Sequence, residues 1–137
     1  MQREFISPSD VFDSRKKYGY WQAINAGNTI YLAGMTARNE EGNIVAEGDI
    51  VGQARQIFEN IRRTLAAAGA SMNDIVRMTI FCKDIQEFAR KLPDYQELAR
   101  EYFGHPTNQP PGTAIQVVSL FEPALMLEIE ATAVIDD

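Results

Sequence analysis

Hydrophobic residues follow a strand-like pattern after a polar N-terminal segment of about 15 residues. That segment, residues 1–15, is predicted to be an extended arm. Aromatic and β-branched residues dominate residues 18–25 and 29–35, and Gly27-Asn28 lies between them. Because Gly-Asn favours a two-residue hairpin turn, we predict two strands joined as a hairpin. A second turn at residues 39–43 is predicted to precede a short strand that starts at Ile44.

The hydrophobic period changes after Asp49. Apolar residues recur at every third or fourth position from Ile50 to Ala68, and Gly69 follows them. This spacing predicts an amphipathic helix that ends at the glycine. Its solvated face is predicted to carry Gln53, Gln56, Glu59, Arg62 and Arg63.

The second half of the chain alternates between further strands and helices. Residues 74–82 are apolar at nearly every position, which predicts a strand covered on both sides. Asp84 and Glu87 have capping-box spacing, so a helix should start at Ile85. Pro93 predicts a break near Leu92 and a second helical piece over residues 94–103. A Gly- and Pro-rich loop over residues 104–111 then leads to strands over residues 113–120 and 125–135.

The predicted order is therefore β-β-(β)-α-β-α-β-β in one domain over residues 1–137. This is an α/β fold with two layers, in which the helices are too few to cover both faces of the sheet. In the last strand, one face is wholly apolar and is predicted to meet the helices: Leu125, Leu127, Ile129, Ala131, Ala133 and Ile135. The other face is half apolar and half ionic: Met126, Glu128, Glu130, Thr132 and Val134. An exposed face of this kind predicts a contact with another copy of the chain.

Charge and composition narrow the function. The chain has 137 residues, with 13 Lys and Arg against 19 Asp and Glu, for a net charge of -6. This acidic balance argues against nucleic acid as a partner. One cysteine and one histidine provide no cluster of metal ligands, and we predict no metal and no cofactor. Without an apolar leader or a long apolar run, the sequence predicts a cytoplasmic protein with no membrane contact.

Two sets of residues are candidates for chemistry. Cys82 with His105 could form a thiol nucleophile pair, but a buried inert thiol and a surface histidine are favoured. Glu128 and Glu130 lie two apart and so share one face of a strand. They are either structural ion-pair partners, for example of Arg77 or Arg38, or general acid–base groups in a cleft between subunits. The aromatic residues Tyr18, Tyr20 and Trp21 either pack together or bind a ligand.

Several blocks of the sequence resemble the RidA/YjgF family of reactive-intermediate deaminases. They are Gln53-Ala54-Arg55-Gln56 with Asn60, Asp74-Ile75-Val76, Lys83-Asp84, the run from Pro110 to Val117, and Leu127-Glu128-Ile129-Glu130-Ala131. The resemblance extends from about Tyr20 to Val134. It implies a chorismate-mutase-like subunit in a homotrimer, with an inner barrel of sheets and ligand clefts between subunits. It also implies hydrolysis of enamines and imines to 2-oxo acids and ammonia without a cofactor.

The resemblance assigns site residues only in part. It places the family's tyrosine at Tyr20, its backbone-contributing glycine at Gly34 and its water-positioning glutamate at Glu128. The arginine that binds the substrate carboxylate in deaminating members corresponds to Gly112, and a small residue that is often cysteine corresponds to Ala114. Arg38 is the best placed replacement for that arginine, although an ordinary ion pair is favoured for it. Trp21 is a further candidate for the binding surface, and a polar helix residue of the cleft is either Asp94 or Gln96.

Three functions therefore remain open from the sequence. The first is a RidA-like hydrolase for a small enamine, imine or related amine or amide that is not a simple 2-imino acid. The second is a trimer that binds or senses a small ligand without chemistry. The third is a scaffold for protein interactions. The first is favoured because Glu128 remains on the predicted cleft face.

Overall fold

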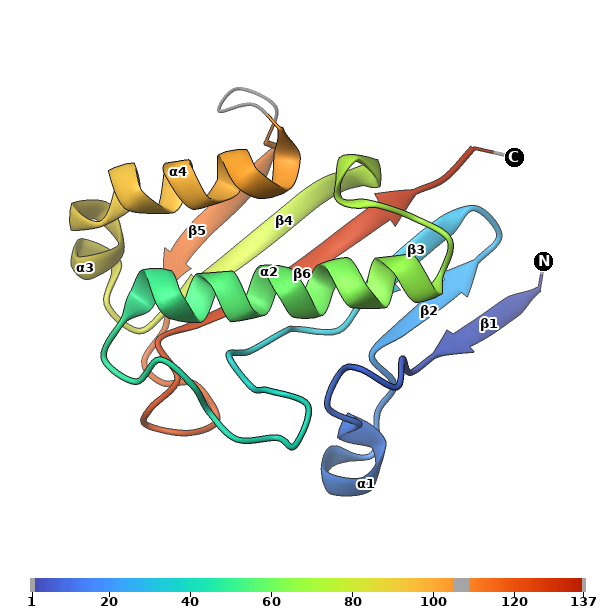
Figure 1. Cartoon of the computed structure of the whole chain (residues 1–137), viewed down its shortest axis with the longest axis horizontal. Helices are drawn as coiled ribbons and strands as arrows, with labels where there is room; N and C mark the ends of the chain where they lie inside the picture. The colour runs from blue at the N-terminus through green and yellow to red at the C-terminus, as the bar shows by residue number, and fades with distance from the viewer. Residues whose placement is uncertain (1, 105–108, 137) are drawn as a thin grey trace.

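A single six-stranded sheet forms one layer of the molecule, and helices pack against one of its faces (Figure 1). The computed structural model describes residues 2–104 and 109–136. The strands are β1 (Arg3–Ile6), β2 (Ala23–Ala26), β3 (Thr29–Leu32), β4 (Ile75–Cys82), β5 (Gly112–Gln116) and β6 (Leu127–Val134). The helices are α1 (Ser14–Tyr18), α2 (Ile50–Ala67), the 3-10 turn η1 (Met72–Asp74), α3 (Ile85–Arg90) and α4 (Leu92–Phe103). This arrangement confirms the predicted fold class, with a two-layer mixture of helices and one sheet.

The strand order is β1-β2-β3-β6-β4-β5. All neighbouring strands are antiparallel except β4 and β5, which are parallel. The predicted hairpin is confirmed, because Ala26 pairs with Thr29 across Gly27-Asn28. Gly27 has a φ of 70°, a conformation that glycine adopts without steric cost.

Local sequence signals explain where the long helices begin and end. The Asp49 side chain accepts a hydrogen bond from the Gly52 amide at the start of α2. The Asp84 side chain does the same for the amides of Gln86 and Glu87 at the start of α3. Pro93 lies in the first turn of α4, where its missing N–H costs nothing, and the break therefore falls between α3 and α4 as predicted.

The core lies between α2, α4 and the sheet. Along β6, Leu127, Ile129, Ala131 and Ala133 are buried, whereas Glu130 and Val134 are exposed on the opposite face. The predicted alternation is confirmed, and it places Glu128 on the face away from the helices. No helix in the described ranges is long and apolar enough to cross a membrane.

The prediction of an extended polar arm over residues 1–15 is wrong. Residues 3–6 form β1, which pairs with β2 at the edge of the sheet, and residues 14–18 form α1. Ile6 and Val11 are buried, so the segment contributes to the core. The strand predicted from Tyr18 starts only at Ala23, because Tyr18 ends α1 and Gly19 continues in the left-handed conformation.

Three further expectations need correction. Gln53 is fully buried rather than solvated, because its amide bonds to backbone groups of Val45, Ala124 and Met126. Strand β4 is covered on one face only in the protomer, since Val76 is exposed. The strand predicted over residues 113–120 ends at Gln116, and residues 117–126 form a loop between β5 and β6.

Candidate functional site

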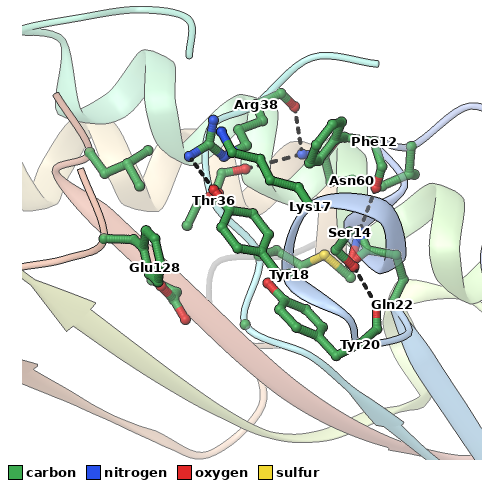
Figure 2. Close-up of a pocket in the computed structure, with 15 residues that line it drawn as sticks. Phe12, Ser14, Lys17, Tyr18, Tyr20, Gln22, Thr36, Arg38, Asn60 and Glu128 are labelled. Atoms are coloured by element: carbon green, nitrogen blue, oxygen red, sulfur yellow. Dashed lines mark hydrogen bonds between the residues drawn. The ribbon is translucent and has the colours of Figure 1, made fainter. Parts of the chain in front are cut away.

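A cavity of about 430 Å³ lies where the sheet, α1 and the loop between β5 and β6 meet (Figure 2). Five residues named as candidates from the sequence line it: Tyr18, Tyr20, Gly34, Arg38 and Glu128. They come from α1 and the segment after it, from the segment after β3, and from β6. The fold thus brings together residues that are more than 100 positions apart in the chain.

Glu128 supplies a carboxyl group with no partner. It faces the cavity from the sheet face opposite the helices and is paired across the sheet with Phe81. Within the part of the chain that the structure describes, its carboxylate forms no hydrogen bond and no ion pair. Burial, followed by the negative charge of Glu130, raises the pKa of Glu128. A half-buried carboxyl of this kind, with no partner among the described residues, can act as a proton acceptor and, once protonated, as a proton donor.

Gly34 makes room for that carboxyl. A β-carbon at this position would lie 2.8 Å from the Glu128 carboxyl carbon and would overlap one of its oxygens. The backbone beside it is fixed, because Met35 and Ile129 exchange two hydrogen bonds of 2.8 and 3.0 Å. The absence of a side chain at residue 34 therefore lets Glu128 sit against the chain there.

Tyr20 places a phenol group in the same cavity. Its backbone is held by α1, because the Ser14 hydroxyl donates a hydrogen bond of 2.8 Å to the Tyr20 carbonyl. Its ring stacks on that of Tyr18 at 6.0 Å. Burial is the main cause that raises the pKa of the Tyr20 phenol, and the charge of Glu128 adds to it. The phenol therefore stays protonated at neutral pH and can donate a hydrogen bond into the cavity.

Arg38 lines the cavity but its guanidinium is already occupied. It donates to the Glu122 carboxylate at 2.9 Å, to the Tyr18 hydroxyl at 3.1 Å and to the Gly42 carbonyl at 2.8 Å. The predicted ion pair of Arg38 exists, but its partner is Glu122 and not Glu128 or Glu130. The alternative ion pair with Arg77 is also absent from the described residues, where Arg77 contacts the Thr113 hydroxyl at 3.4 Å.

The other predicted site residues lie away from this cavity. Trp21 packs against Phe5 in a tilted arrangement, with ring centroids 5.3 Å apart, and Arg15 lies over its ring. Gly112 and Ala114 lie on the edge strand β5, opposite Met78 and Ile80. Asp94 and Gln96 are exposed on α4. Within one protomer, therefore, the structure places none of these five residues in the cavity with Glu128.

Gly112 also has a local role. A β-carbon there would collide with the backbone carbonyl of Met78, because β5 pairs closely with β4 at this point. An arginine placed at residue 112 would thus require β5 to move. Cys82 is fully buried, and burial raises the pKa of its thiol to about 11, in agreement with an inert thiol. His105 lies outside the described residues.

Sequence reasoning missed the polar residues that support the cavity. The Asn60 amide, buried on α2, donates to the carbonyls of Thr36 and Arg38 at 3.1 and 2.9 Å. Gln22 is buried beneath α1, where its amide donates to the Phe12 carbonyl. A polar residue inside an apolar helix stripe was the available signal for Asn60, whereas nothing local marks Gln22.

The arrangement provides proton transfer and hydrogen bonding rather than a metal centre. Among residues 2–104 and 109–136, no group of three or more His, Cys, Asp or Glu is arranged to hold a metal ion. What the cavity offers is a carboxyl with a raised pKa, a phenol and aromatic walls. This combination can position a small molecule and a water molecule and can exchange protons with both.

Comparison with known proteins identifies the family. The model of the endoribonuclease L-PSP family matches residues 14–135. A RutC family protein from Pyrococcus horikoshii is 40% identical over 114 residues, which cover 83% of this chain and 85% of that protein. A 2-iminobutanoate/2-iminopropanoate deaminase from Salmonella typhimurium is 33% identical over 115 residues, 84% of this chain and 86% of that protein.

Among solved structures, one described as a putative endoribonuclease from Thermotoga maritima superimposes with a TM-score of 0.84 at 28% identity. The match covers 100% of both chains. Sequence and fold therefore agree over nearly the whole length, which confirms the resemblance found in the sequence. The chain belongs to the endoribonuclease L-PSP family, the family of the RidA/YjgF proteins.

Proposed function

We propose that this protein hydrolyses the C=N bond of a small imine, or of the enamine that is its tautomer, and releases ammonia. The observation that carries the proposal is the unpaired Glu128 carboxyl, which faces the cavity against Gly34 and close to Tyr20. Relatives named 2-iminobutanoate/2-iminopropanoate deaminase support this reaction class. No metal or organic cofactor is required for the steps below.

In the proposed reaction, Glu128 takes a proton from water as the water oxygen bonds to the imine carbon. The C=N π electrons move to nitrogen, which takes that proton from Glu128, and a carbinolamine results. Glu128 then accepts the proton of the carbinolamine hydroxyl and passes it to the nitrogen, so that a C=O bond forms as the C–N bond breaks. The nitrogen leaves as ammonia, so the net change is imine plus water to carbonyl compound plus ammonia. The Tyr20 phenol donates a hydrogen bond to the substrate and holds it in line with the water.

An enamine substrate needs one earlier step. Protonation of its β-carbon by Glu128 gives the iminium ion, which is the protonated imine, and water then adds to it. The raised pKa of Glu128 favours the protonated carboxyl that this transfer needs. One carboxyl can therefore act first as an acid and then as a base.

We also propose that the working unit is a homotrimer with clefts at the seams between subunits. The open sheet face supports this, because Tyr31, Ile115 and Val134 are exposed there without helices to cover them. Assembly at this face would bring residues of a neighbouring copy, such as those of the edge strand β5, toward the Glu128 cavity. The proposed location is the cytoplasm.

The function is tested by following imine hydrolysis with matched variants. Imines of different size and charge are generated in solution, the 2-imino acids by an amino acid oxidase and the uncharged imines by an amine oxidase, and the loss of imine is measured by trapping with semicarbazide. We expect the wild type to accelerate hydrolysis, Glu128→Gln to lose at least about 100-fold in kcat/KM, and Glu97→Gln to stay within about threefold. Glu97 is the matched control because it removes the same charge from an exposed residue of α4 that does not line the cavity.

Two results together would refute the proposed function. If the wild type leaves every imine at its spontaneous rate, and Glu128→Gln behaves like the wild type, the hydrolase function is wrong. Binding of an unchanged small ligand in the cavity would then favour the non-catalytic trimer, and capture of one specific enzyme would favour the interaction scaffold.

A further inference from the structure

The cavity has an aromatic end, defined here as Tyr18, Tyr20 and Phe121. The Tyr18 ring stacks on Tyr20 at 6.0 Å and meets Phe121 edge-on at 5.0 Å. The three residues come from α1, from the segment after it and from the loop between β5 and β6. Phe121 is 76% exposed in the single protomer, so its ring can contact a ligand there. This end is an aromatic surface suited to a ring or a branched apolar group.

Two cations border the aromatic end, and one carboxylate, that of Glu122, lies near both of them. In Figure 2, Arg38 and Lys17 lie on one side of Tyr18, and Tyr20 lies on the other. The Arg38 guanidinium is 2.9 Å from one oxygen of Glu122, and the Lys17 ammonium is 3.9 Å from the other oxygen. The Arg38 side chain is only 7% exposed, whereas Lys17 extends into solvent. Glu122 thus cancels the one buried positive charge of the cavity.

This pairing works against an anionic ligand. A ligand carboxylate that approaches Arg38 must compete with Glu122, which already accepts a hydrogen bond from the same guanidinium at 2.9 Å. Glu128 faces the cavity without a hydrogen-bond or ion-pair partner among the described residues, and it repels an anion when it is ionised. The net charge of -6 adds to the same effect over longer distances.

The size of the cavity favours a ligand with a ring over a small imino acid. A volume of about 430 Å³ is within the range of sites for ligands much larger than a three-carbon imino acid. A small ligand would leave the aromatic end unfilled and would forgo those contacts. A ligand with a ring can occupy the aromatic end while its C=N group lies near Glu128.

We propose that the Glu122–Arg38 ion pair determines specificity by neutralising the aromatic end, so that the site selects an uncharged imine with an aromatic group over an anionic 2-imino acid. The inference rests on the proposed imine hydrolysis for the identity of the reacting group. It assigns Glu122 as the specificity residue, and it assigns Tyr18 and Phe121 as the surface that holds the ring.

The test measures binding of two stable ketones, the products of the corresponding imines, by titration calorimetry. Phenylacetone and phenylpyruvate share the benzyl group and differ in the carboxylate. We expect the wild type to bind phenylacetone at least about tenfold more tightly than phenylpyruvate. Glu122→Gln, which leaves Arg38 without its partner, should shift this ratio at least about fivefold toward phenylpyruvate.

Glu101→Gln is the matched control, because it removes the same charge from an exposed ion pair with Arg55 on α2. It should leave the ratio unchanged. Phe121→Ala should weaken both ketones alike, since it removes ring contact without changing the charge. Melting curves show whether each variant is folded. The ratio of the wild-type affinities for the two ketones tests the inference without any variant.

A wild-type preference for phenylpyruvate overturns the inference, as does an unchanged ratio in a folded Glu122→Gln or the absence of binding by either ketone. These outcomes are separate from those of the hydrolase test. Preference for phenylacetone without any imine hydrolysis refutes the reaction but supports the ligand class. Hydrolysis of 2-imino acids together with a preference for phenylpyruvate supports the reaction but refutes the ligand class.

Discussion

Gly34→Ala is the substitution whose effect follows most directly from the geometry. Gly34 does not have a positive φ, so an alanine there causes no backbone strain. The new β-carbon would lie 2.8 Å from the Glu128 carboxyl carbon, whereas ordinary contacts begin at 3.4 Å. The backbone cannot retreat, because the two hydrogen bonds between Met35 and Ile129 pin it to β6. The Glu128 side chain must therefore move by about 0.6 Å or more, away from its place beside Tyr20.

The size of the expected effect follows from that displacement. A reacting group misplaced by about 1 Å typically costs about 100-fold in rate, so we expect kcat/KM for imine hydrolysis to fall about 10- to 100-fold. Crowding should cost about 1–2 kcal/mol of unfolding free energy, or about 3–6 °C in Tm for a domain of this size. Steady-state hydrolysis and thermal melting followed by circular dichroism measure the two effects.

A second substitution separates this explanation from general damage. Glu128→Asp shortens the side chain by one methylene, so it should restore the Tm of Gly34→Ala to within about 1 °C of Glu128→Asp alone. The reasoning is refuted if Gly34→Ala is as active and as stable as the wild type. It is also refuted if the two substitutions destabilise the protein additively.

Three further predictions concern the charge of the site, its support and its assembly. The raised pKa of Glu128 means that folding favours its protonated form, so its contribution to stability declines as pH rises above the unfolded pKa of about 4.3. Glu128→Gln should therefore raise Tm at pH 7 but not at about pH 3.5, and an equal effect at both would contradict this. Gln53→Leu removes three buried hydrogen bonds and should lower Tm by about 6–15 °C, whereas Leu at the exposed Gln96 should change it little. Tyr31→Glu together with Val134→Glu places charge on the open sheet face and should convert a trimer into monomers of 15.4 kDa in sedimentation, and a persistent trimer would locate the interface elsewhere.

The elements that could be predicted from the sequence are those with strong local signals. Helix α2 combines a long apolar stripe with the Asp49 cap, and the β2–β3 hairpin is marked by its Gly-Asn turn. Helix α1 was missed because five residues cannot show a period, and its only signals are the Asp13 cap and the left-handed Gly19. Its position depends on tertiary hydrogen bonds from Ser14, which no local pattern reveals.

Residues of the candidate site could also be predicted where a local pattern marks them, but not where the contact is made by a distant segment. Glu128 could be found because strand alternation places it on a face of its own, opposite the buried residues of β6. The partner of Arg38 could not be found, because Glu122 lies 84 positions away on a loop that was predicted only as a connection. Gln53 was assigned to the wrong environment for the same reason, since two of its partners lie more than 70 positions further along the chain.

The position of β6 in the sheet has a consequence for how the molecule acquires its structure during synthesis. Although β6 is the last strand in chain order, it lies between β3 and β4 and joins the two halves of the sheet. Until residues 127–134 emerge from the ribosome, the β1-β2-β3 unit and the β4-β5 unit have no shared backbone pairing. During that interval both units would expose unpaired strand edges, and the apolar face of α2 would remain uncovered. We therefore expect nascent chains that stop before Leu127 to depend on chaperones, and the cavity, which needs Glu128, to form only in the last step of folding.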